Sequence, residues 1–176
     1  MKFFNIFDEE KRGAFVFKCV EEKVDELKVM KGEEDFPSAF EIIKGVREYD
    51  FHITDLFGVY LVSQKFVETV KSLNATGVNF KEVTIPGVKG RYFGLSASGR
   101  SGGFDKSSST IREVELTKGF KVKQKMGVTI HESTWDHSDF FVPEGSAAIV
   151  ITERIAEALR SLTNICVSPL EDMIVS

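Results

Sequence analysis

The chain has 176 residues, of which 42% are hydrophobic and 28% are charged, as expected for one folded domain with its own core. The formal net charge of −4 argues against a nucleic-acid binder held by phosphate contacts. It fits a basic protein partner, and equally many ordinary soluble domains. No apolar stretch reaches the length of a membrane-spanning helix, and the apolar start of the chain is too short for a signal peptide. We therefore expect a cytoplasmic protein without membrane contact.

The aromatic residues are mostly Phe, with 16 Phe against 3 Tyr and 1 Trp. Phe has a large apolar area and no polar group, so most of these rings are expected in the core. Cys19 and Cys166 both lie in apolar runs, which predicts free, buried thiols in a reducing compartment. A disulfide between them remains possible.

Residues 1–49 are expected to form N-terminal strands and a short helix. Two apolar runs, Phe3–Phe7 and Ala14–Val20, predict strands. Residues 21–35 are rich in charged side chains, which indicates an exposed strand or loop. The apolar residues of segment 39–46 lie at roughly helical spacing, so the helix is expected there.

Residues 50–85 form the first of two predicted repeat units. Val59–Val62 is a short apolar run typical of a strand, and the hydroxyl of Ser63 can cap a following helix. The predicted helix has one apolar face, made by Phe66, Val67, Val70 and Leu73. Residues 74–77 end this helix, and a strand is expected over residues 78–85.

Residues 96–110 are dense in Gly and Ser and predict a flexible loop without core residues. Apolar and charged residues then alternate over 111–116, which is typical of a half-buried strand. A further strand is expected over residues 127–130.

Residues 139–172 form the second predicted unit. Asp50–Leu73 aligns with Asp139–Leu162 without a gap, and five of the 24 positions are identical. This match predicts an internal duplication, although any two units with a strand, a cap, a helix and a strand resemble each other. We therefore expect an α+β fold: a single domain over residues 1–176, with two duplicated strand-strand-helix-strand units and a mixed or antiparallel sheet.

Three segments begin like enzyme sites but lack an essential residue. His131-Glu132 starts a zinc-protease motif, but Trp135 occupies the position of its second His. Gly99–Gly103 lacks the Gly-Lys-Ser/Thr sequence and the following helix of a phosphate-binding loop. No nucleophile pattern accompanies the three His residues of the chain. The sequence therefore predicts no catalytic residue, no metal and no cofactor, and we expect that the protein is not an enzyme.

The segment around the single Trp remains as a candidate contact surface. Trp is enriched at protein interfaces, and this Trp lies beside His and Asp residues in a turn-like context. We predict partner contacts from this segment together with the preceding Gly-rich loop, through Trp135, Asp136, His137, Asp139, Arg100 and Phe104. The alternative is that Trp135 fills the core and Asp139 serves as a local turn or cap residue.

The C-terminal part of the chain resembles a known family. Residues 135–145 contain a Ser-Asp-x-Phe turn, residues 149–159 an apolar strand followed by Thr-Glu-Arg, and residues 162–170 a closing strand after Thr-Asn. In these features the chain is similar to a bacterial family first catalogued as a domain of unknown function. That family was later grouped with immunity proteins of polymorphic-toxin and type VI secretion systems. The resemblance covers about residues 50–172.

The resemblance implies an immunity protein that neutralises a cognate toxin by binding it. It transfers no catalytic residue, and a stoichiometric inhibitor agrees with the absence of recognisable chemistry in the sequence. Two other functions remain: a non-catalytic adaptor or loading chaperone for a secreted effector, and an enzyme of unrecognised type. Neither the identity of the toxin nor the oligomeric state follows from the sequence.

Overall fold

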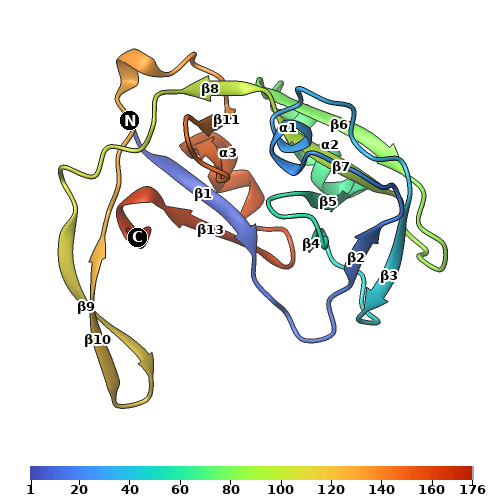
Figure 1. Cartoon of the computed structure of the whole chain (residues 1–176), viewed down its shortest axis with the longest axis horizontal. Coiled ribbons are helices and arrows are strands. Elements are labelled where there is room, and N and C mark those ends of the chain that lie inside the picture. The colour runs from blue at the N-terminus through green and yellow to red at the C-terminus, as the bar shows by residue number, and fades with distance from the viewer. Residues whose placement is uncertain (176) are drawn as a thin grey trace.

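The computed structural model describes residues 1–175, without the side chain of Leu116, and shows a mixed α+β fold (Figure 1). The elements in chain order are β1 (Phe3–Asp8), β2 (Val16–Cys19), α1 (Glu26–Met30), β3 (Phe40–Lys44), β4 (Phe51–Ile53), β5 (Tyr60–Ser63), α2 (Gln64–Ser72), β6 (Val78–Val83), β7 (Tyr92–Ala97), β8 (Gly99–Ser101), β9 (Thr110–Thr117), β10 (Phe120–Met126), η1 (Glu132–Thr134), β11 (Phe140–Pro143), β12 (Ile149–Thr152), α3 (Glu153–Leu159), β13 (Ile165–Pro169) and η2 (Leu170–Asp172). No described helix is long and apolar enough to cross a membrane.

A five-stranded sheet is built from the two ends of the chain, in the order β13-β1-β12-β11-β8. The N-terminal strand β1 lies inside this sheet and pairs antiparallel with both β12 and β13. Strands β11 and β8 are parallel neighbours, so the sheet is mixed. Because β1 lies between β12 and β13, the N-terminal and C-terminal parts of the chain are joined in one sheet.

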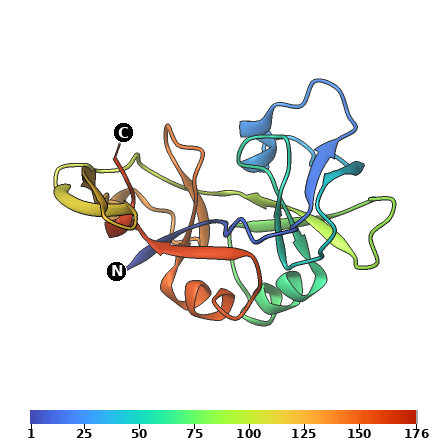
Figure 2. The same ribbon diagram turned by 90° about the horizontal axis from the view of Figure 1, so that it is seen from below.

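The second main sheet is antiparallel, with the order β4-β5-β7-β6. Helix α2 follows strand β5 of this sheet, just as helix α3 follows strand β12 of the larger sheet. The two helices, α2 and α3, lie next to each other on the same side of the molecule (Figure 2). The sheet order β4-β5-β7-β6 thus corresponds to β11-β12-β1-β13, with β1 in the place that β7 takes in the smaller sheet.

One hydrophobic cluster joins the two sheets and both helices. Helix α2 contributes Phe66, Val67 and Val70, and helix α3 contributes Ile155, Ala156 and Leu159; all six are buried. Full burial of a large apolar side chain stabilises by about 1.5–3 kcal/mol, so this helix pair is a large part of what holds the sheets together. The apolar face predicted for α2 is confirmed: Phe66, Val67 and Val70 are buried and Leu73 is partly buried.

The expected N-terminal helix lies elsewhere in the chain. Segment 39–46 contains the strand β3, which pairs with β2, and the helix is α1 within the charged segment 21–35. Asp25 caps α1 by accepting a hydrogen bond from the backbone N–H of Lys28, and Val29 and Met30 at its end are buried. The prediction of a helix over residues 39–46 was wrong, and the exposed loop expected over residues 21–35 is found only outside α1. A helix this short needs only a cap and two buried residues, too few to give a periodic pattern.

The Gly- and Ser-rich segment 96–110 is also more ordered than expected. Ser96 and Ala97 at its start are the last two residues of β7, and residues 99–101 form β8, which pairs with β11. Gly99 is needed for close packing, because a Cβ atom there would lie 2.3 Å from the carbonyl oxygen of Phe140. The single Gly of β8, Gly99, therefore allows the close approach of two strands.

The expected strand over residues 127–130 is not formed, and Thr129 makes only an isolated bridge with Asp105. Most of the Phe residues, ten of 16, are buried as predicted. Both cysteines are free thiols, with Cys19 buried and Cys166 partly exposed.

Candidate functional site

The connection between β8 and β11 is the most unusual part of the fold. Parallel neighbouring strands need a long crossover, which is usually a helix that covers the sheet. Here the crossover, residues 102–139, contains the strands β9 and β10 and the short turn η1. Binding residues often lie on connecting segments that a rigid scaffold holds in place. We therefore treat the crossover as the candidate site.

Strands β9 and β10 form a two-stranded ribbon that projects from the body of the molecule (Figure 1). Lys118 and Gly119 make its tight turn, in which Gly119 has a φ of +84°, a conformation that favours glycine. None of the described side chains of the ribbon is buried. The half-buried strand expected over 111–116 is therefore a strand, but its described side chains are exposed or only partly covered.

The base of the ribbon is held by several contacts. Arg112 donates to the carboxylate of Asp172 at 2.9 Å, and Ile174 forms a bridge with Met126. The Ser109 hydroxyl donates to the Gly127 carbonyl at 2.5 Å. These contacts fix where the ribbon leaves the body while leaving its tip free.

The structure brings the predicted loop and the Trp segment together. The backbone N–H of Arg100 donates to the Asp136 carboxylate at 2.8 Å, and the N–H of Asp136 donates to the Arg100 carbonyl at 3.1 Å. Burial alone would raise the pKa of Asp136, but hydrogen bonds from Ser138 and Arg100 hold it below its ordinary value. Phe104 is partly buried nearby, and His137 is exposed.

Trp135 belongs to the core, as the alternative interpretation expected. Its side chain is only 7% exposed, and its ring packs edge-on against Phe3 at a centroid distance of 5.0 Å. The indole N–H donates to the Ser138 carbonyl at 3.0 Å. A partner could reach only the rim of this ring, so Trp135 is a poor contact residue in this conformation.

The Arg100 side chain is committed to the fold. Its guanidinium donates to the carbonyls of Ala97, Gly99 and Lys31 and to the carboxylate of Glu33. These bonds tie β8 to the end of α1. Among the predicted contact residues, Asp136 and His137 are exposed, whereas Phe104 is partly buried against the hydrophobic cluster that contains Trp135.

Asp139 is buried and joins the two halves of the molecule. Its carboxylate accepts hydrogen bonds from the Thr152 hydroxyl at 2.9 Å and the Thr76 backbone N–H at 2.9 Å, and it forms an ion pair with Arg154. Thr152 precedes α3 but makes no side-chain capping bond to that helix. Burial would raise the pKa of Asp139, and the bonds from Arg154, Thr76 and Thr152 outweigh it and lower that pKa.

Asp50 makes the matching contacts in the other direction. It accepts hydrogen bonds from the Ser63 hydroxyl at 2.7 Å and from the backbone N–H and hydroxyl of Thr163, both at 2.8 Å. Ser63 also caps α2, as predicted, by accepting from the Phe66 N–H at 3.2 Å. Asp50 thus bonds Ser63, just before α2, and Thr163, just before β13. Asp139 in the same way bonds Thr152, just before α3, and Thr76, just before β6.

A single buried histidine, His52, lies among aromatic side chains apart from the crossover. It was not recognised in the sequence. His52 has no exposed surface; its Nδ1 lies 3.1 Å from the Phe15 carbonyl, and its Nε2 accepts from the Tyr49 N–H at 2.9 Å. Burial lowers the pKa of His52 to about 4. The only sequence signal was its position between two apolar residues of a strand, which does not distinguish a core His from a functional one.

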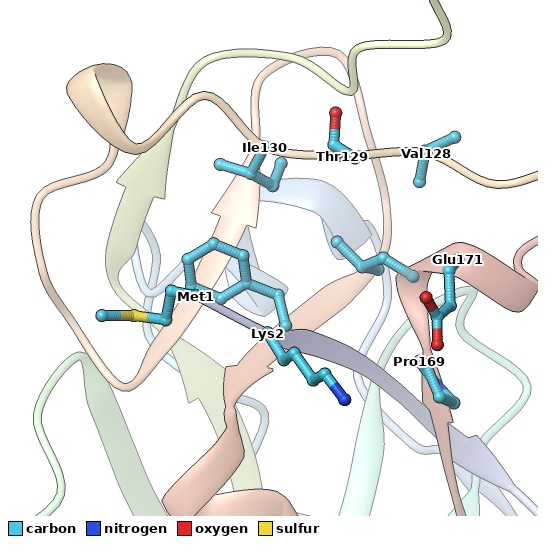
Figure 3. Close-up of a pocket in the computed structure, with 9 residues that line it drawn as sticks. Met1, Lys2, Val128, Thr129, Ile130, Pro169 and Glu171 are labelled. Carbon is cyan, nitrogen blue, oxygen red and sulfur yellow. The ribbon is translucent and has the colours of Figure 1, made fainter. Parts of the chain in front are cut away.

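Residues 1–175 line hollows of different sizes. The best-defined one, of about 130 Å³, lies between the start of β1, residues 128–130 and residues 169–171, with Lys2 and Glu171 at its rim (Figure 3). Ligand pockets usually measure about 300–1,000 Å³. A larger hollow of about 530 Å³ lies between the β1–β2 connection and the end of β3. Within residues 1–175, no group of three His, Cys, Asp or Glu side chains could hold a metal ion.

Comparison with known proteins leaves the family open. No protein-family model matches the sequence, and no curated protein is detectably similar to it.

Proposed function

We propose that this chain is an immunity protein that binds and neutralises a cognate bacterial toxin. The observation that carries the proposal is the crossover of residues 102–139, which presents an exposed ribbon and turn on two sheets that share one core. Rigid scaffolds that position exposed loops are typical of binding proteins. The resemblance of residues 135–170 to toxin-immunity proteins supports the same function.

We further infer that the scaffold arose by duplication of a strand-strand-helix-strand unit. Three observations support this: the corresponding strand orders, the neighbouring helices α2 and α3, and the reciprocal bonds of Asp50 with Thr163 and of Asp139 with Thr76. A pair of units locked in this way gives a stiff base, and stiffness lowers the entropy that a binding surface loses on association.

The proposed inhibitor acts in the cytoplasm, where it would meet a toxin made in or delivered to the same cell. The two free thiols, Cys19 and Cys166, agree with a reducing compartment. The protein would form a one-to-one complex, without a cofactor and without chemistry of its own.

The test is co-expression with the toxin encoded in the adjacent reading frame, followed by binding measurements with the purified pair. We expect survival of the cells, a stable one-to-one complex and loss of toxin activity in vitro. Cells that die at the usual rate, or a toxin that stays fully active at saturating inhibitor, would contradict the proposal. A complex that affects only the export of the toxin, with its activity intact, would identify an adaptor or loading chaperone instead.

A further inference from the structure

The β9–β10 ribbon has two different faces. Paired residues of an antiparallel ladder share a face, and the faces alternate along each strand. One face carries Thr110, Arg112, Val114, Val122, Gln124 and Met126, and its base meets residues 172–174. The other face carries Ile111, Glu113 and Glu115 on β9 and Lys121, Lys123 and Lys125 on β10. This second face, called the striped face below, is exposed along its whole length.

The charges of the striped face are separated by strand. Its acidic residues lie on β9 and its basic residues lie on β10, with one ion pair across the ladder between Lys121 and Glu113 at 3.0 Å. Within residues 1–175, Lys123 and Lys125 form no ion pair within 4.0 Å. The striped face is therefore a basic row beside an acidic row, with most of the lysine charge unpaired.

The ribbon as a whole is basic on an acidic protein. Residues 110–126 contain five basic and two acidic side chains, so they carry +3 while the rest of the chain carries −7. Opposite charge on a partner would therefore be attracted to the ribbon and repelled by the body, which orients an encounter.

An exposed aromatic side chain stands at the tip. Phe120 follows the turn and is 59% exposed, and Ile111 near the base is 73% exposed. An exposed aromatic ring can anchor an interface, because aromatic side chains that become buried on binding are the usual centre of its binding energy. A two-stranded ribbon alone is also marginally stable in water, and a partner that covers it would add the missing packing.

We propose that the striped face of the β9–β10 ribbon is the surface that docks on the toxin. The matching toxin surface carries a row of carboxylates opposite β10. It also has an apolar pocket at the tip of the ribbon for the ring of Phe120, which lies beyond the register shift between Phe120 and Lys121. This inference rests on the proposed function and names the part of the crossover that recognises the partner.

The mixed charge of the striped face favours a protein partner over a nucleic acid. Glu113 and Glu115 lie beside the lysines and would repel a phosphate backbone, whereas a protein surface can match both rows. Lysines on a free strand also protect against edge-to-edge aggregation. Protection from aggregation requires a charge of either sign on the strand, whereas recognition of the toxin requires a positive charge. Replacing the lysines by Glu therefore removes recognition and keeps protection.

The experiment measures the affinity of the full chain for the toxin from the adjacent reading frame, at low and at physiological salt. Phe120→Ala and the triple variant Lys121→Glu/Lys123→Glu/Lys125→Glu test the ribbon. Phe57→Ala, which removes a ring 70% exposed elsewhere, and Lys65→Glu/Lys71→Glu/Lys89→Glu, which changes the net charge equally on exposed lysines outside the ribbon, are the matched controls. Thermal unfolding confirms that the body of each variant is folded, and hydrogen exchange of the β9 and β10 amides confirms that its ribbon is intact.

We expect Phe120→Ala and the ribbon triple variant each to weaken binding at least about 30-fold, as for an interface hot spot, with the controls within about threefold. The loss for the triple variant should shrink at high salt. Full binding by both ribbon variants would overturn the inference and leave the proposed function standing. Failure of the wild-type chain to bind or protect would overturn the proposed function as well. Binding of a short DNA duplex that the ribbon triple variant loses would replace the protein partner by a nucleic acid.

Discussion

At the residue scale, His52 is the clearest case of a side chain whose role is set by its surroundings. Both ring nitrogens are occupied: Nδ1 faces the Phe15 carbonyl, and Nε2 accepts from the Tyr49 N–H. This arrangement fixes one neutral tautomer, because a carbonyl requires a donor and an N–H requires an acceptor. Burial disfavours the charged form and lowers the pKa from 6.5 to about 4.

This histidine makes stability depend on pH. Below pH 6.5 the unfolded chain binds a proton at His52 that the folded chain refuses, so the free energy of unfolding falls as the pH drops from about 6.5 to 4. The loss from this residue approaches about 3 kcal/mol. Urea unfolding at a series of pH values checks it. His52→Gln should be less stable at neutral pH but flatter over this range, whereas the exposed control His137→Gln should follow the wild type. A wild-type curve that is flat between pH 4 and 6.5 would contradict the assignment.

Trp135 gives a second prediction at this scale. Because its ring is buried against Phe3 and Phe141, Trp135→Ala should lower the free energy of unfolding by about 3–5 kcal/mol, as expected for a large core aromatic. His137→Ala, two residues along and exposed, should change it little. Denaturant unfolding measures the free energy of unfolding of both variants. A Trp135→Ala protein as stable as the wild type would show that Trp135 is not a core residue and would favour a contact role.

At the element scale, the body is stabilised by buried apolar side chains, whereas the described part of the β9–β10 ribbon is not. The helices α2 and α3 are held by buried apolar faces, whereas the described side chains of the ribbon lie outside the hydrophobic clusters. The ribbon is therefore expected to contribute little to the stability of the body.

The ribbon can be tested by excision. Thr110 and Met126 are paired at its base, so a Gly-Gly link can replace residues 111–125 without moving either end. We expect the shortened chain to unfold within about 1 kcal/mol of the wild type, since few buried contacts are lost. Hydrogen exchange of β1 and β12 serves as the readout for the body. A shortened chain that exchanges these amides rapidly would show that the ribbon supports the sheets.

At the scale of the whole molecule, the N-terminal strand completes the larger sheet. Phe3, Phe4 and Ile6 of β1 are buried, and the strand pairs on both edges. Without it, β12 and β13 would lose their shared neighbour, and both would present open edges. The two ends of the chain must therefore meet before the sheet is complete, a contact of high sequence separation that slows folding.

Truncation tests this closure. A chain that starts at Glu9 should lose cooperative unfolding and near-UV circular dichroism, while removal of Met1 and Lys2 alone should leave both nearly unchanged. Co-expression with a peptide of residues 1–9 should restore the fold of the truncated chain if β1 acts only by completing the sheet. A cooperative transition in the truncated chain without the peptide would show that the sheet is stable with the strand missing.

Much of the fold follows from local patterns. The strand-helix-strand order around Ser63 and around Thr152 was predicted, because a helix with one apolar face and a clear stop leaves a periodic signal in the sequence. The side-chain capping bond is formed by Ser63 but not by Thr152. The strands β1 and β2 were also predicted from their apolar runs. The candidate contact surface stays a prediction. Arg100 and Asp136 lie together, whereas Trp135 and Asp139 are buried.

What the sequence by itself determined is the set of amphipathic units, since the spacing of apolar side chains acts over a few residues and needs no partner. Only the tertiary structure decided which strands pair, that β1 lies between β12 and β13, that α1 forms in a charged segment, and that the lysines of β10 are exposed. These outcomes depend on contacts between residues far apart in the chain, and a side chain such as Trp135 or His52 carries no local mark of which surface will cover it.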